Sequence, residues 1–149
     1  MAKQNGAAET KQSGLPVYAY VKKNQTGDMQ GVLVHHATQQ GWRFAALAEL
    51  LRICEHCLDC MGGPQHTHRL RAFYDDFKKE EIPPMESKEM ETWRPEEPNT
   101  FIIRVQHRQN ASWQGSVQWV EGGKEQHFRS ALELIKLMDE ALEKAEQNE

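Results

Sequence analysis

The sequence contains no long hydrophobic run. No segment approaches the roughly 20 consecutive apolar residues that a membrane-spanning helix requires. The first six residues are polar or small and do not form the apolar centre of a secretion signal. These absences predict a cytoplasmic protein that has no contact with membranes.

Cysteine is scarce. The chain has three, Cys54, Cys57 and Cys60, all within one short segment. An odd number at this spacing does not make the disulfide framework of a small secreted protein, and reduced thiols fit the cytoplasm. Disulfides are therefore not expected to hold this fold together.

An excess of basic residues is also missing. The chain has 18 Lys and Arg against 22 Asp and Glu, so its net charge is -4. Residues 59–99 carry ten of the acids and six of the bases, which accounts for the whole excess. Proteins that coat nucleic acid are usually basic overall. The charge therefore argues against strong non-specific binding to DNA.

Recognisable catalytic motifs are absent. The pairs Gly62-Gly63 and Gly122-Gly123 fit turns, and neither begins a phosphate-binding fingerprint. No Ser, Asp or Cys stands in a recognisable nucleophile setting near the scattered histidines. The sequence therefore predicts a protein that is not an enzyme.

What the chain does have is an internal repeat. Residues 16–58 and 100–142 align without a gap at a constant offset of 84 positions. Identities include Gln30-Gly31 with Gln114-Gly115, and Glu49-Leu50 with Glu133-Leu134. Apolar positions between these identities also match. The pattern indicates one supersecondary unit used twice.

Each copy shows the same order of predicted elements. Strand-forming segments with alternating polarity are followed by a segment with helical spacing of apolar residues. In the first copy we expect strands at Tyr18–Lys23, Met29–His36 and Trp42–Phe44, and a helix at Ala45–Leu58. In the second we expect strands at Phe101–Arg108, Trp113–Val120 and Gln126–Arg129, and a helix at Ala131–Leu142.

These elements predict an α+β fold. Two tandem ββ(β)α repeats would form a pseudo-symmetric antiparallel sheet with helices on one face. The expected organisation is a disordered tail at 1–14, the first repeat at 15–60, a bridging segment at 61–99, the second repeat at 100–142 and a tail at 143–149.

The bridging segment should contain a helix and an acidic, proline-rich linker. Leu70, Phe73, Tyr74 and Phe77 recur at helical spacing, which predicts a helix at His68–Lys79. Residues 80–98 hold four prolines and many acids, which is typical of a linker. Its single Trp93 is expected to dock on the domain, because indole rings are seldom left in water.

The two repeat helices should differ at their first turn. Ser130 followed by Glu133 is a capping-box pattern, in which each side chain bonds a backbone amide of the other residue. The first copy has Ala46 in place of Ser130, so its helix should start less firmly. The apolar stripe of the second helix should include Leu132 and Met138.

The strand pattern also predicts an exposed sheet face. Phe101, Ile103 and Val105 alternate toward the helices, so the residues between them point away. This outer face is the candidate binding surface, because it mixes aromatic rings, cations and amides. Its candidate residues are Tyr18, Tyr20, Lys22, Arg104, Gln106, Arg108, Gln114 and Gln118.

The favoured function is that of a non-catalytic binding or adaptor protein. Tyr and Arg are enriched at protein interfaces, and Val32 and Val34 would form an apolar patch on the outer face. A protein partner or a homodimer could cover that patch. The alternative is binding of single-stranded nucleic acid, with rings stacking on bases and Arg or Lys meeting phosphates.

A zinc-stabilised regulatory module is a further alternative. Cys57, Cys60, His66 and His68 could converge on one metal ion if the helix ended near Leu58. The repeat argues against this, because Cys54 and Cys57 align with Met138 and Ala141, which are ordinary helix-packing residues. No cofactor is therefore expected.

The second copy resembles short uncharacterised bacterial proteins. The resemblance lies in Arg108–Gly115, which reads Arg-Gln-Asn-Ala-Ser-Trp-Gln-Gly, and in Phe128–Leu134, which reads Phe-Arg-Ser-Ala-Leu-Glu-Leu. It covers about a third of the chain and implies a bacterial origin. It implies no activity.

Overall fold

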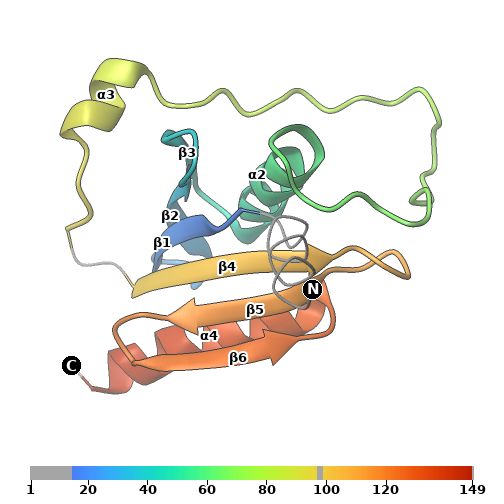
Figure 1. Ribbon diagram of the computed structural model, residues 1–149. Coiled ribbons are helices and arrows are strands. Elements are labelled where there is room, and N and C mark those ends of the chain that lie inside the picture. Colours follow the sequence, from blue (N-terminus) through green and yellow to red (C-terminus); the bar gives the residue numbers. More distant parts are fainter. Residues whose placement is uncertain (1–14, 97–98, 149) are drawn as a thin grey trace, which may run out of the picture.

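The computed structural model describes residues 15–96 and 99–148. The chain forms an α+β fold with one six-stranded sheet and helices packed against it (Figure 1). Its elements, in chain order, are β1 (Val17–Lys23), β2 (Met29–His35), β3 (Gln40–Phe44), α2 (Leu47–Cys60), α3 (Ser87–Thr92), β4 (Asn99–His107), β5 (Gln114–Trp119), β6 (Lys124–Phe128) and α4 (Ala131–Gln147).

The sheet is antiparallel throughout, in the order β3-β2-β1-β4-β5-β6. Its centre is the pairing of β1 with β4, where Tyr18 lies opposite Ile102. These two residues are separated by the same 84 positions that separate the repeated segments. Strands β3 and β6 form the two outer edges.

The two halves of the sheet have matching register. In β1–β2, Val21 pairs with Gly31, and in β4–β5, Val105 pairs with Gly115. Gly31 then pairs with Phe44, and Gly115 with Phe128. A side chain at either glycine is impossible without movement, because its Cβ would lie within 2 Å of a carbonyl oxygen on the neighbouring strand.

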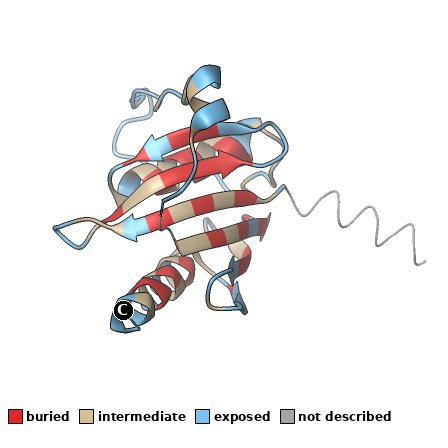
Figure 2. Cartoon of the chain, turned by 90° about the vertical axis from the view of Figure 1, so that its left-hand side faces the viewer, coloured by how far each residue is buried: buried red, intermediate tan, exposed pale blue. Residues whose placement is uncertain are grey.

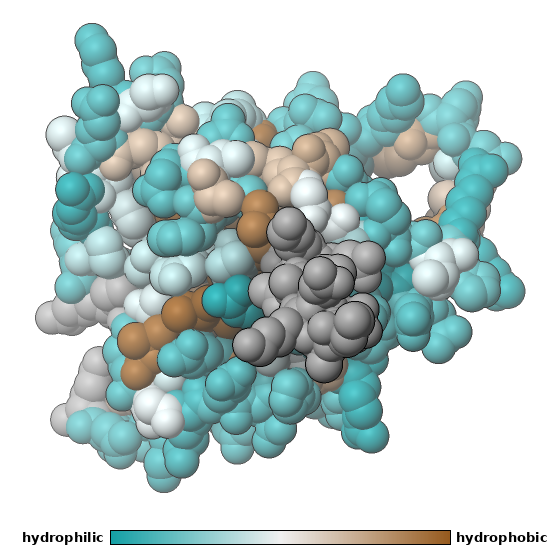
Figure 3. Space-filling model, viewed as in Figure 1, coloured by the Kyte–Doolittle hydropathy of each residue, from teal (hydrophilic) through white to brown (hydrophobic). Residues whose placement is uncertain are grey.

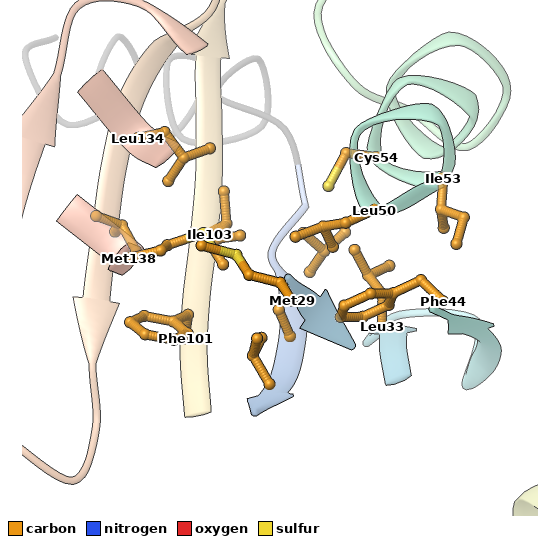
Figure 4. Packing of buried hydrophobic residues seen from close by; sticks show 14 of the residues in the cluster. Met29, Leu33, Phe44, Leu50, Ile53, Cys54, Phe101, Ile103, Leu134 and Met138 are labelled. Carbon is orange, nitrogen blue, oxygen red and sulfur yellow. The ribbon is translucent and has the colours of Figure 1, made fainter. Parts of the chain in front are cut away.

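Both long helices cover the same face of the sheet. Their apolar residues join residues of all six strands in one continuous core (Figure 4). Met29 lies between the side chains from the two ends of this core in Figure 4, with Ile103 and Met138 to one side and Leu33 and Phe44 to the other. Inward and outward positions alternate along the central strands (Figure 2), as expected for a half-buried sheet.

The helix starts confirm half of the predicted capping box. The Ser130 hydroxyl accepts a hydrogen bond from the Glu133 amide at 3.1 Å. The Glu133 carboxylate accepts instead from the Arg129 amide, at 2.7 Å, one residue before the position that the motif predicts. Ala46 provides no side-chain cap, as expected.

The predicted helix at His68–Lys79 does not form. Residues 68–79 follow an extended, irregular path, and the apolar residues that defined the helical spacing lie in solvent. An isolated helix of this length is marginal in water unless another element covers its apolar stripe. Nothing in the described part of the chain covers this one, and the segment stands away from the body of the molecule (Figure 3).

The linker contains one short helix that the sequence did not predict, α3. It lies on the side of the sheet opposite α2 and α4. Just before α3, the Met85 amide donates a hydrogen bond to the Gly41 carbonyl of β3 at 2.7 Å. Trp93 follows α3 and packs edge-to-face on Tyr20, with ring centroids 5.3 Å apart. The prediction that Trp93 docks on the domain is confirmed.

Helix α4 differs from the prediction in its length and in one residue of its buried face. Helix α4 continues past Leu142 to Gln147, so much of the expected C-terminal tail is helical. Leu132 is 60 % exposed, so its place in the predicted stripe of α4 is wrong. Met138 of the same prediction is buried, and Ala141 is buried beside it. The tail predicted at 1–14 lies outside the described residues.

Candidate functional site: the outer face of the sheet

The first half of the outer face is covered by the chain itself. Val32 and Val34 are buried, so the prediction of an exposed apolar patch is wrong. Met90 of α3 approaches Gly41 so closely that a Cβ there would lie 2.6 Å from its sulfur. Arg43 anchors the same helix, donating from Nε to Glu89 at 3.0 Å. The acidic linker thus provides the cover that we expected from a partner.

A cleft of about 690 Å³ remains between this cover and the sheet. Tyr20 and Trp93 line it together with Lys22, Arg43 and Arg94. Burial raises the pKa of Tyr20 above its usual value, with smaller contributions from Tyr18 and Glu121. The Tyr20 hydroxyl is therefore protonated at neutral pH, where it can both donate and accept a hydrogen bond. Two predicted residues, Tyr20 and Lys22, thus belong to a cleft rather than to a flat surface.

The second half of the outer face is open. Its surface residues lie in adjacent register positions, with Ile102 between Tyr18 and Gln118, and Ser116 between Arg104 and His127. Arg104, Gln118 and His127 are exposed, and Tyr18 and Ile102 are half-buried. We refer to the following five residues as the open strip: Tyr18, Ile102, Arg104, Gln118 and His127.

One end of the open strip carries a stacked pair of rings. Tyr18 lies parallel to His36, with ring centroids 4.9 Å apart and an angle of 17° between the planes. Arg104 lies diagonally across the β1–β4 pairing from Tyr18, a spacing within reach of long side chains. A planar ring pair and a guanidinium group at this spacing can contact a flat or an anionic group.

Arg108 is not part of the outer face, so this prediction is wrong. It is 1 % exposed, and it donates from Nη2 to Asp59 at 2.6 Å and from Nε to the Pro64 carbonyl at 2.6 Å. The cause is a bulge between Val105 and His107, which shifts the register of β4 against β5. A bulge adds a residue to one strand and so reverses which face the following side chains point to. Arg108 therefore holds the α2 end against β4.

The remaining amides have different roles. Gln114 closes the β4–β5 loop, because its side chain accepts from the Gln109 amide at 3.0 Å and donates to the Gln109 carbonyl at 2.9 Å. Gln114 is thus committed to the hairpin. Gln106 lies at the bulge and is half-buried.

The candidate zinc ligands are not brought together. Cys57 is buried among core residues, while Cys60 is exposed at the end of the same helix. Burial raises the pKa of Cys57 to about 12, and zinc binds the thiolate. His66 bonds from Nε2 to Glu55 at 3.2 Å, and His68 is exposed. Within the described residues there is no group of three His, Cys, Asp or Glu placed to hold a metal ion.

A scan against protein-family models gives no match. Comparisons with curated proteins and with solved structures give no significant match either. Within the described residues, no helix combines the length and the apolar character needed to cross a bilayer.

Sequence reasoning missed the contribution of the linker to the site. Trp93 was expected to dock, but the strand pattern could not indicate that it would dock on Tyr20. Gly41 offered a signal, because a glycine in a strand often marks close approach of another segment. His36 and His127 extend the surface beyond the predicted set.

Proposed function

We propose that this protein is a non-catalytic binding or adaptor protein and that the open strip, with the adjoining Tyr20–Trp93 cleft, is its recognition surface. The observation that carries the proposal is the unequal cover of the outer face. The chain covers the apolar half with α3 and Trp93 and leaves the half with Arg104, Gln118 and His127 exposed. Among the residues that the structure describes, nothing covers this half, so a macromolecule could contact the sheet there.

We also infer that the scaffold is a tandem duplication of one ββ(β)α unit with pseudo-twofold symmetry. Side-chain bonds at the helix starts support this. Leu47 donates to Asp28 as Ala131 donates to Ser112, and Ala45 donates to Glu49 as Arg129 donates to Glu133. In each pair of bonds, both partners are displaced by 84 positions.

Ion pairs between the halves further support the duplication. Lys23, at the end of β1, lies 3.1 Å from Asp139 and 3.7 Å from Glu143 on α4. Arg108, just after β4, bonds Asp59 on α2, and Asp59 is the position that corresponds to Glu143. Each half therefore holds the helix of the other through a cation at the end of its central strand.

A protein partner is the favoured ligand. The open strip combines a half-buried apolar centre, Ile102, with a polar rim, an arrangement common at protein interfaces. Capture from a lysate of the source organism, followed by mass spectrometry, tests this. We expect a partner that is retained by the wild-type chain and lost with Arg104→Ala or Tyr18→Ala. A Lys136→Ala variant, altered on the exposed side of α4, is the matched control and should retain it.

Single-stranded nucleic acid is the second candidate ligand, favoured by the Tyr18–His36 stack beside Arg104. Rings can receive unpaired bases while the guanidinium contacts phosphate. Titration with a labelled oligothymidine of about 20 nucleotides at low salt tests this. Binding should weaken steeply with added salt and disappear with Arg104→Ala. A flat titration at low salt would exclude this ligand.

The location and origin of the protein are likewise proposals. All three cysteines are free thiols, which supports a reducing, cytoplasmic compartment. The two segments that resemble short bacterial proteins meet in the fold, because the Ser112 hydroxyl accepts from the Ala131 amide at 3.3 Å. This contact is consistent with their forming one structural motif, and we propose a bacterial source.

A further inference from the structure

The structure has an apolar groove on the helix side of the sheet, at the β6 edge. Its volume is about 440 Å³. Phe101, Val117 and Ala141 form its buried floor, and the half-exposed Trp119 and Leu137 form its walls. An open slot of this kind next to a sheet edge is suited to receiving large apolar side chains.

The corresponding place in the other half of the molecule is smaller, with a volume of about 330 Å³. Trp42, on β3, is buried there and packs edge-to-face on His56. Ile82, from the linker, packs against the same end of the core. The residue 84 positions after Trp42 is Gln126, which is exposed. The second half therefore lacks the side chains that narrow this slot in the first half.

Residues 68–79 of the same chain contain large apolar side chains that are exposed to solvent. Phe73 is fully exposed, and Tyr74 and Phe77 are more than half exposed; Leu70 is also exposed. Their spacing places them on one face of a helix, as in peptides that fold when they bind a groove. We refer to residues 68–79 as the aromatic segment.

Charge on the two surfaces is complementary. The aromatic segment has four Arg and Lys against two Asp. Helix α4, which forms one wall of the groove, has five acids against two lysines. The groove itself is lined by three acids, Glu125, Glu140 and Glu143, and by two bases, Lys124 and Lys144, so its rim has a net charge of -1. A basic segment with aromatic anchors therefore suits an apolar slot with an acidic rim.

The aromatic segment cannot reach the groove of its own chain. Its C-terminal end is tied to α2, because Arg52 donates to the Glu80 carbonyl, and Ile82 packs nearby at the β3 edge. Phe77 is three residues from Glu80, a reach of at most about 11 Å. Phe73 is seven residues from Glu80, which is also about 11 Å when the segment is helical. Strands β3 and β6 lie at opposite edges, five strand spacings or about 24 Å apart. Contact therefore requires a second chain.

We propose that two copies of this protein associate by exchanging aromatic segments, each folding as a helix into the α4–β6 groove of the other copy. The exchange buries Phe73, Tyr74 and Phe77 where Trp42 and Ile82 lie in the first half. It leaves the open strip free for another ligand.

Sedimentation equilibrium tests the association. The wild-type chain should form a concentration-dependent dimer below about 1 mM. The double variant Phe73→Ser with Phe77→Ser should weaken dimerisation at least about tenfold, because the two rings that the dimer would bury are then missing. Glu125→Lys with Glu140→Lys should also weaken it. Glu91→Lys, on α3, and Arg104→Ala, on the open strip, should not. A monomer at all concentrations, or a dimer indifferent to both double variants, would overturn the proposal.

Disulfide trapping identifies the contact. In a Cys60→Ser background, a Phe77→Cys chain is mixed with a Leu137→Cys chain and treated with a mild oxidant. We expect an inter-chain disulfide in this mixture. Leu132→Cys, on the exposed side of the same helix, is the matched control and should give little product. Equal trapping at Leu132 and Leu137 would show that the segment does not select the groove. Because Arg104 is unaltered here, this result is independent of the proposed function.

Discussion

The two halves of the molecule share a framework and differ in what covers it. Both have three antiparallel strands in the same register, followed by a helix that begins after an equivalent turn. In the first half, the linker covers the outer face and Trp42 narrows the helix-side groove. In the second half, Arg104, Gln118 and His127 of the outer face are exposed and the helix-side groove is wider. The framework thus depends on shared backbone contacts, while the surfaces available for binding depend on residues that differ between halves.

The largest effects are expected at the paired glycines. Gly31→Ala and Gly115→Ala should each lower the free energy of unfolding by about 3 kcal/mol, because the new Cβ would overlap a backbone carbonyl on the neighbouring strand. Urea denaturation measures both. Gly123→Ala is the control: it lies in a turn with free space and a positive φ, and should cost about 1 kcal/mol. If only one of the two substitutions were tolerated, Gly31 and Gly115 would not be equivalent.

The ion pairs between the halves should be unequal. Arg108→Met removes two charge-assisted hydrogen bonds from a buried site and should cost about 2 kcal/mol. Lys23→Met should cost less, because its partners Asp139 and Glu143 are about half exposed and solvent screens the pair. Thermal unfolding of both variants at low and high salt checks this. Equal losses, or a stronger salt dependence for Arg108, would contradict it.

The first turns of α2 and α4 should differ in stability by a smaller amount. Ser130→Ala should lower stability by about 1 kcal/mol, since the Glu133 amide loses its acceptor. Ala46→Ser should raise stability by up to about 1 kcal/mol, because Ala46 has the extended backbone of Ser130 and no side-chain cap. Urea denaturation of the two single variants and the double variant measures this. A loss of stability in Ala46→Ser would mean that the two helix starts are not equivalent.

The smallest expected effect is the pH dependence that His35 gives to the first half. Burial lowers the pKa of His35 below 6.5; the Met61 carbonyl opposes the shift and His36 adds to it. The ring bonds Thr38 through Nδ1 at 3.0 Å. The unfolded chain therefore binds more protons, so stability is full above pH 6.5 and falls as the pH drops below it. The second half has Trp119 at this position.

Replacing the imidazole tests that assignment. His35→Leu should flatten the fall in unfolding free energy between pH 6.5 and lower values, whatever its effect on stability at neutral pH. A His127→Leu variant is the control, because His127 is exposed and should leave the slope unchanged. An unaltered slope in His35→Leu would assign the pH dependence to another group.

Local patterns in the sequence predicted the elements of both halves. Alternation and helical spacing located the six strands and the two long helices to within a few residues, because nearest neighbours along the chain determine those periods. The inward positions Phe101, Ile103 and Val105 were correct for the same reason. The predicted stripe of α4 was correct at Met138 and wrong at Leu132, because apolar residues occupy more than one face of that helix.

The tertiary structure alone decided which of those surfaces are free. The alternating pattern of the strand predicts that Arg108 points outward. In the structure, a bulge turns its side chain toward Asp59, a partner 49 positions away. Residues 68–79 have the spacing of a helix, but no surface in the described part of the chain covers them, so they stay extended. Val32 is buried only because α3 and Trp93 return across the sheet. Burial depends on contacts between elements that are far apart in the sequence, and periodicity along the chain does not predict those contacts.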